Sequence, residues 1–100
     1  MITVGLWVRL IAKPGKEATV AEFLEGAVKL AEQETGTVLW CAVRLSPTEF
    51  AIFDGHTDEA GRQAHLNGEV AAAILANAGD WLAEPPVIEQ TDFLALKLPA

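Results

Sequence analysis

The sequence predicts an α+β domain in which strands and helices follow the order βαββαβ. Residues 2–10 alternate between apolar and other side chains, which is the period of a strand. Apolar side chains recur every three to four residues from Val20 to Ala31, which is the period of a helix that faces a core. A hairpin over residues 37–55, a second helical region and a last strand follow. This order is typical of a ferredoxin-like fold, a four-stranded antiparallel sheet with its helices on one face.

Both faces of this sheet are expected to be covered. The face of the first strand that is opposite to Leu6 and Val8 carries Trp7 and Ile11, which are costly to leave in water. The last strand, over residues 87–98, is rich in leucine and is expected to be largely buried. The two helical regions can cover only one face, so the sequence predicts that a second copy of the sheet covers the other.

Turn and cap residues set the expected ends of the helices. Gly36 stands where a left-handed residue would end the first helix. The second helical region is expected over residues 58–83, with Thr57 as its N-cap. Asn67-Gly68 interrupts that region, and because Asn-Gly favours positive φ we expect two helical segments.

Length, composition and charge exclude several classes of protein. One hundred residues, 51% of them hydrophobic, predict a single folded domain over residues 1–100. Lys and Arg number 7 against 14 Asp and Glu, which argues against a nucleic-acid partner and an anionic membrane surface. No apolar run approaches the roughly 20 residues of a membrane span, and the first ten residues lack the pattern of a signal peptide. Cys41 has no second cysteine to pair with. These features predict a cytoplasmic protein.

Three stretches together resemble the antibiotic biosynthesis monooxygenase (ABM) family. They are "VRLIAKPGKEATVAEFLE", "ETGTVLW" and "FAIFDGHTDEAGRQAHL", in this order along the chain. Members of this family are dimeric α+β barrels, in which two sheets face one another and the helices lie outside. Some of them are small oxygenases that oxidise quinols or polycyclic aromatic phenols with dioxygen and without metal or flavin. The resemblance therefore implies a homodimeric oxidoreductase, a monooxygenase that needs no cofactor.

His65, in "AHL", matches a recurring histidine position of the family near the pocket between sheet and helices. A histidine exchanges a proton near neutrality, so His65 is the expected catalytic residue, either as proton acceptor or as anchor of the substrate hydroxyl. Several family members carry another histidine five positions later, where this chain has Val70. In one unbroken helix His65 would lie away from the apolar stripe, as an ordinary surface histidine. Only a break at Asn67-Gly68 would turn it inward.

Metal and haem chemistry are not expected. The same fold hosts haem-degrading monooxygenases, which need a helix histidine and an asparagine on the first strand. Leu75 and Val8 stand at these places, so the axial ligand is missing. His56 and His65 are nine residues apart across a turn, which is not a metal-binding spacing.

Four aromatic side chains are candidates for the wall of a pocket that takes a flat aromatic ligand, although aromatic residues at such strand and helix positions more often belong to a core. They are Trp40, Phe50, Phe53 and Trp81. His56 is expected in a loop at the pocket mouth, also as a substrate-binding residue. Asp54 is expected to cap the turn after its strand, with the orientation of a histidine as the alternative.

Two other functions remain open beside the monooxygenase that acts with dioxygen on a small phenol or quinol. One is a non-catalytic, stress-responsive dimeric barrel that binds a small hydrophobic ligand or only itself. The absence of the second histidine and the few polar groups expected in the pocket favour it. The other is an isomerase or lyase that moves a proton on the same scaffold, because the fold alone does not fix the chemistry.

Overall fold

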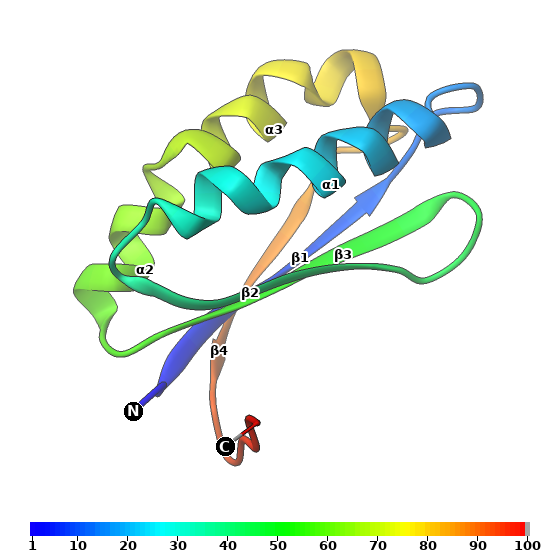
Figure 1. Cartoon of the computed structure of the whole chain (residues 1–100). Helices are drawn as coiled ribbons and strands as arrows, with labels where there is room; N and C mark the ends of the chain where they lie inside the picture. The colour runs from blue at the N-terminus through cyan, green and yellow to red at the C-terminus, as the bar shows by residue number, and fades with distance from the viewer. Residues whose placement is uncertain (100) are drawn as a thin grey trace.

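The computed structural model describes residues 1–99, which form one sheet and one layer of helices. The elements are β1 (Val4–Ile11), α1 (Glu17–Glu32), β2 (Thr37–Arg44), β3 (Glu49–His56), α2 (Glu59–Leu66), α3 (Glu69–Trp81) and β4 (Val87–Asp92). The strands pair antiparallel in the order β2-β3-β1-β4, and the helices lie on one face of the sheet (Figure 1). This confirms the ferredoxin-like fold. The sheet of the single chain is open, and no helix within residues 1–99 is long and apolar enough to cross a bilayer.

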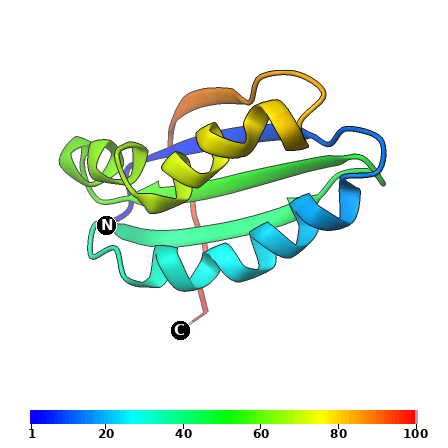
Figure 2. The ribbon, with the colours of Figure 1, turned by 90° about the horizontal axis from the view of Figure 1, so that it is seen from above.

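The core lies between the sheet and the two longer helices, α1 and α3, which run side by side across it (Figure 2). Val8 and Leu10 of β1 pair in register with Ile52 and Phe50 of β3, and all four side chains face the helices. The helices contribute small and branched side chains to the same cluster: Val20, Leu24, Ala27, Val70 and Ile74. Full burial of each large side chain contributes roughly 1.5–3 kcal/mol. The buried residues recur at the strand and helix spacings that the sequence predicted, so those spacings are confirmed.

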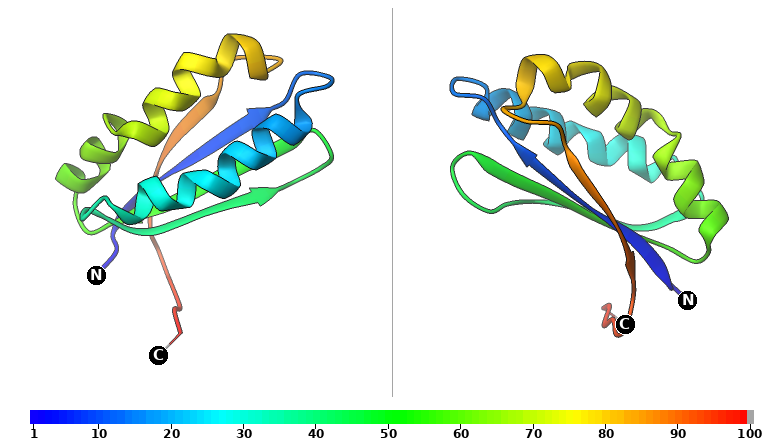
Figure 3. Two further views of the ribbon diagram at one scale, coloured as in Figure 1. Left: turned by 45° about the horizontal axis from the view of Figure 1, so that its top comes forward. Right: turned by 180° about the vertical axis from the view of Figure 1, so that it is seen from behind.

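The break between α2 and α3 is confirmed, but positive φ is not its cause. Asn67 and Gly68 have φ of −97° and −90°, and among residues 1–99 only Gly15 has a positive φ. Gly68 is extended, with ψ of −173°, and begins α3 as its N-cap. The chain therefore changes direction at this residue, and the two segments appear as separate helices (Figure 3).

Asp58, and not Thr57, is the N-cap of α2. The Asp58 carboxylate accepts a hydrogen bond from the backbone N–H of Gly61 at 2.9 Å, which is the usual three-residue spacing of an N-cap. The carbonyl of Thr57 instead accepts a hydrogen bond from the hydroxyl of Thr3 at 2.8 Å. The expected cap was therefore one residue too early.

Gly36 does not end α1 in a left-handed conformation, because α1 ends at Glu32 and its C-cap Gln33 is right-handed. A Cβ atom on Gly36 would lie 2.9 Å from the Cα atom of Gly61, and a Cβ atom on Gly61 would lie 2.8 Å from the carbonyl oxygen of Gly36. Glycine is required on both sides, because the loop between α1 and β2 here touches the backbone of α2.

The last strand is shorter than expected. β4 ends at Asp92, which pairs with Val4, the first residue of β1. Residues 93–98 lead away from the sheet (Figure 3), and Leu94 is 98% exposed. The prediction of a strand is therefore right only for residues 87–92, with one further backbone hydrogen bond from Phe93 to Thr3, and the prediction of burial is wrong for both halves, because β4 is an edge strand that is exposed in the single chain.

Substitution of Gly61 by alanine is expected to destabilise the fold by about 1–3 kcal/mol, because the new Cβ atom meets the backbone of Gly36. Gly26 is the matched control. A Cβ atom at Gly26 meets nothing within 4 Å, and alanine in the middle of α1 is expected to stabilise by about 1 kcal/mol. Urea unfolding measures both free energies. A Gly61→Ala protein as stable as the wild type would contradict the close contact.

Candidate functional site

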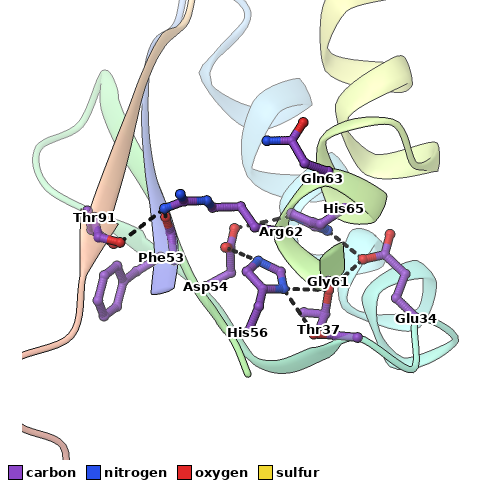
Figure 4. Close-up of polar contacts among 12 residues, drawn as sticks. Glu34, Thr37, Phe53, Asp54, His56, Gly61, Arg62, Gln63, His65 and Thr91 are labelled. Atoms are coloured by element: carbon purple, nitrogen blue, oxygen red, sulfur yellow. Dashed lines mark hydrogen bonds and ion pairs between the residues drawn. The ribbon is translucent and has the colours of Figure 1, made fainter. Parts of the chain in front are cut away.

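His65 is buried at the end of α2. Its side chain faces the sheet and is 5% exposed, as expected if the helix breaks after it. Its Nδ1 atom lies 2.5 Å from the Glu34 carboxylate, and its Nε2 atom lies 3.2 Å from the Asp54 carboxylate (Figure 4). The surface position that an unbroken helix would give is therefore wrong, because α2 and α3 do not share one axis.

Asp54 and His56 belong to β3, where alternate residues face the helices. Both are fully buried, and the Asp54 Oδ1 atom lies 2.7 Å from His56 Nε2. The His56 Nδ1 atom is 3.0 Å from the carbonyl oxygen of Gly36. The expectation of a loop histidine at a pocket mouth is wrong, because His56 is the last residue of the strand and lies beneath the loop between α1 and β2. Asp54 faces the two histidines and does not cap the turn.

One chain of contacts thus joins Glu34, Asp54, His56 and His65, here named the histidine cluster. Asp54 and the two histidines are buried, and the Glu34 side chain is 21% exposed. Thr37 extends the cluster, because its hydroxyl donates to Glu34 Oε1 at 2.7 Å. The polar atoms of the cluster point at one another (Figure 4), and within residues 1–99 no three of these side chain types converge to hold a metal ion. Sequence reasoning missed Glu34, because it is 31 residues from His65 and no pattern links the two.

Two opposing effects set the pKa of His65. Burial lowers it, because an imidazolium loses its hydration. The neighbouring carboxylates of Asp54 and Glu34 favour the charged form and outweigh burial, so the pKa of His65 is raised above its usual value. The charged form carries a hydrogen on both ring nitrogens. His65 can therefore accept a proton only after it has lost one of its own.

Arg62 ties α2 to the middle of the sheet. Its side chain is 6% exposed, and its Nη1 atom donates to the carbonyl oxygens of Gly5 at 3.3 Å and Thr91 at 3.2 Å. Hydrogen bonds from Arg62 and Gln63 lower the pKa of Glu59 to about 2. The spacing Glu59-x-x-Arg62 was the one sequence signal for this pair, since residues three apart are neighbours on a helix.

A small apolar pocket lies beside His65, between the sheet and the pair α2 and α3. Its lining residues are Leu6, Val8, Ile52, His65, Leu66, Val70, Ala71, Ile74, Leu75 and Ile88. His65 is the one polar side chain among them. The pocket volume of about 30 Å³ matches a single water molecule. Leu75 and Ile88 are 61% and 42% exposed, so the wall between the pocket and solvent is thin.

The four aromatic candidates do not share this pocket. Trp40 and Phe50 line a separate groove of about 430 Å³ between α1 and β2. Phe53 lies on the opposite face of the sheet, edge-on to Trp7 with ring centroids 6.1 Å apart. Trp81 packs on Phe23 of α1, with centroids 5.2 Å apart. In the single chain they therefore form no common wall, because alternation along β3 sends Phe50 and Phe53 to opposite faces.

Solved structures share the whole fold. The NE2512 protein of unknown function from Nitrosomonas europaea is 54% identical to this chain, with a TM-score of 0.96, over 100% of this chain and 97% of that one. This chain belongs to the same family as NE2512. No model of a described protein family matches the sequence, and no curated protein does.

More distant structures carry the name that the sequence resemblance suggested. A protein from Nitrosomonas europaea and one from Caulobacter crescentus, both provisionally described as antibiotic biosynthesis monooxygenases, are 18% and 22% identical to this chain, with TM-scores of 0.81 and 0.77. The alignments cover 92% and 94% of this chain and 90% and 92% of theirs. The resemblance to the ABM family is thereby confirmed at the level of the fold.

The stability of the protein is expected to fall as the pH rises above neutrality. A raised pKa of His65 means that its contribution is complete below the unfolded value of about 6.5 and is lost as the pH rises through the folded value. In His65→Gln this part of the pH dependence is expected to disappear. Melting temperatures measured from about pH 6 upward test this, a range well above the pKa of Glu59, which is about 2.

Glu49→Gln serves as the control for this titration. Glu49 pairs with Arg9 rather than with a histidine. The melting temperature of this variant should keep the wild-type dependence on pH. If the wild type shows no loss of stability above neutral pH, His65 is not held in its charged form.

Proposed function

We propose that this protein is a cofactor-independent monooxygenase that acts on a small aromatic phenol or quinol in the pocket beside His65. The observation that carries the proposal is a single ionisable side chain, His65, in the lining of an otherwise apolar pocket between sheet and helices. The fold shared with the structures described as monooxygenases supports it. Leu75 and Val8 are hydrocarbon side chains that could not ligate a haem iron.

The proposed reaction draws its electrons from the substrate. When a phenol becomes a quinone, one atom of dioxygen enters the ring and the other leaves as water, and the phenol supplies all the electrons. The phenol must first ionise, because its anion is the electron-rich form that reduces dioxygen. Its proton passes to solvent before the ring enters the pocket, since His65 already carries a hydrogen on each ring nitrogen. An apolar pocket assists by excluding water from the reacting centre.

His65 has two possible parts in this reaction. As a proton acceptor it would act from its neutral form, which the raised pKa makes scarce at neutral pH. As an anchor it would donate a hydrogen bond to the oxygen of the substrate. The geometry favours the anchor, because both ring nitrogens lie within 3.2 Å of a carboxylate and so carry hydrogens.

An aromatic ring needs more room than about 30 Å³. We infer that the ring enters at the thin wall formed by Leu75 and Ile88, where two large side chains are already partly in solvent. Rotation of these side chains would enlarge the pocket without disturbing His65, which is held by Glu34 and Asp54.

Oxygen consumption with a panel of hydroquinones and naphthols tests the function. The wild type is expected to consume dioxygen with at least one compound without added metal or flavin. His65→Ala is expected to lower the rate by about 10²–10⁴-fold, the usual size of an acid–base or hydrogen-bonding contribution. Glu49→Gln, on the far face of the sheet, should keep the wild-type rate. Absence of uptake with the whole panel would refute the proposal.

A non-catalytic barrel that binds a small hydrophobic ligand is the second candidate. The size of the pocket at rest and the carboxylates beside both nitrogens of His65 favour it, because together they leave neither room for a ring nor a free base to ionise a substrate. In that case a naphthol would raise the melting temperature of the protein, as any ligand of the folded state does, without consumption of dioxygen.

We also propose that the protein is a homodimer. The outer face of the sheet carries Trp7 and Phe53, and Phe53 extends to Phe93 with ring centroids 5.3 Å apart. Beside them the segment after β4 exposes Leu94, Leu96 and Leu98 by 98%, 43% and 49%. Exposed large apolar patches of this kind mark association surfaces. A second copy would cover them and complete the two-sheet barrel.

Light scattering in solution tests the dimer. The wild type is expected at twice the chain mass of 10.7 kDa, and Trp7→Glu is expected to shift it toward the monomer. Leu75→Ser is the control, because Leu75 is 61% exposed on the helix side, away from the proposed interface. A wild type that remains monomeric at all concentrations would contradict the proposal.

A further inference from the structure

The hydrogens of the histidine cluster can be counted from its contacts. His56 Nδ1 faces a carbonyl oxygen, so it must carry a hydrogen. One hydrogen between His56 Nε2 and Asp54 Oδ1, on either atom, satisfies that contact. His65 meets a carboxylate oxygen at each nitrogen, so each of these contacts also needs one hydrogen. If any one of these hydrogens were removed, the two atoms of that contact would face each other with their lone pairs in a buried site.

One contact in the cluster is looser than the others. Asp54 Oδ2 is buried without a hydrogen bond, although His65 Nε2 lies 3.2 Å away, because the two atoms are not aligned for one. The Nδ1 atom of His65, by contrast, is 2.5 Å from Glu34. The Nε2–H group is therefore held by charge but is not committed to a hydrogen bond, and it can still donate one.

We propose that Asp54 is the positioning residue of this site, which keeps the Nε2 hydrogen on His65 so that this N–H group can donate to an oxygen atom of the ligand. Asp54 acts through His65 and does not itself line the pocket. His56 has a supporting part, since its Nε2 atom occupies the other oxygen of the same carboxylate. The inference rests on the proposed function for the identity of the ligand, but not for the state of His65.

The charges around His65 support this arrangement. Glu34 reaches it from the loop between α1 and β2, and Asp54 from β3. Arg62 and Glu59 of α2 neutralise each other in an ion pair. The two carboxylates that contact His65 raise its pKa, in agreement with a hydrogen on each nitrogen.

The arrangement also defines the ligand. A pocket lined by apolar side chains and by one histidine matches a molecule that has a single acceptor oxygen and is otherwise hydrocarbon. The ionised phenol of the proposed reaction has this form, because its oxygen accepts hydrogen bonds and has no hydrogen to donate.

Nitrogen-15 spectra of the imidazole rings test the inference directly, because the chain has only two histidines. In the wild type near neutral pH, His65 is expected to show a hydrogen on both nitrogens. In Asp54→Asn the amide can donate to Nε2, so His65 should keep only its Nδ1 hydrogen. In Glu34→Gln the amide can donate to Nδ1, so His65 should keep only its Nε2 hydrogen. Each variant should lower the titration midpoint of His65 by at least tenfold in proton affinity, which is one pH unit.

The two variants should therefore leave the hydrogen of His65 on opposite ring nitrogens. If Asp54 and Glu34 had only a structural role, the two substitutions would change the stability of the protein but not the position of this hydrogen. Glu49→Gln should leave the spectrum of His65 unchanged. A wild-type His65 with one hydrogen at neutral pH would overturn the inference even if the variants fail to fold. Addition of 1-naphthol should shift the Nε2 signal of the wild type, whereas naphthalene, which has no oxygen, should not. If the ring states are as expected but no dioxygen is consumed, the monooxygenase proposal fails and the positioning role remains.

Discussion

The buried carboxylate of Asp54 constrains the arrangement of everything around it. A carboxylate removed from water costs several kcal/mol unless donors replace its hydration. Here the compensating groups are His56, two residues along the same strand, through a hydrogen bond, and the charged ring of His65 from α2, whose Nε2 atom lies 3.2 Å away. His56 lies beside Asp54 because residues two apart on β3 are on the same face of the sheet. His65 can reach Asp54 only if α2 lies directly on the end of the sheet, so the carboxylate fixes the position of that helix.

The attachment of α2 is polar, unlike that of the other helices. Its two buried side chains are Arg62 and His65, whereas α1 and α3 bury alanine, valine, leucine and isoleucine. Hydrogen bonds require a defined direction, so they hold α2 in one orientation where an apolar face would tolerate small shifts. The glycine contact between Gly36 and Gly61 brings the backbones close enough for these bonds. The pocket lies at the boundary between this polar attachment and the apolar core.

Periodicity was sufficient to predict the fold from the sequence, because strands and helices that face one core must repeat at their own spacing. The site was harder to predict. His65 could be named, but its orientation depended on whether Asn67-Gly68 breaks the helix. The partnership of Glu34 with His65, and of His56 with Asp54, depends on how a loop and a strand end meet in three dimensions. The segment after β4 was misjudged because its leucine content indicates that these side chains are buried, but does not tell whether they pack within their own chain or against a second one.

His65 is held by polar contacts and the pocket wall by apolar ones, and this difference determines which part of the site can move to admit a ligand. His65 is held by two carboxylates from two different elements, so moving it would break its contact with Glu34 and leave the buried Asp54 carboxylate without its charged partner. The wall at Leu75 and Ile88 is held by apolar contact alone, and both side chains already meet solvent. Opening this wall costs only the burial of part of two side chains, roughly 1–3 kcal/mol. The rigid part of the site is therefore the donor, and the adaptable part is the apolar wall that would receive the ring.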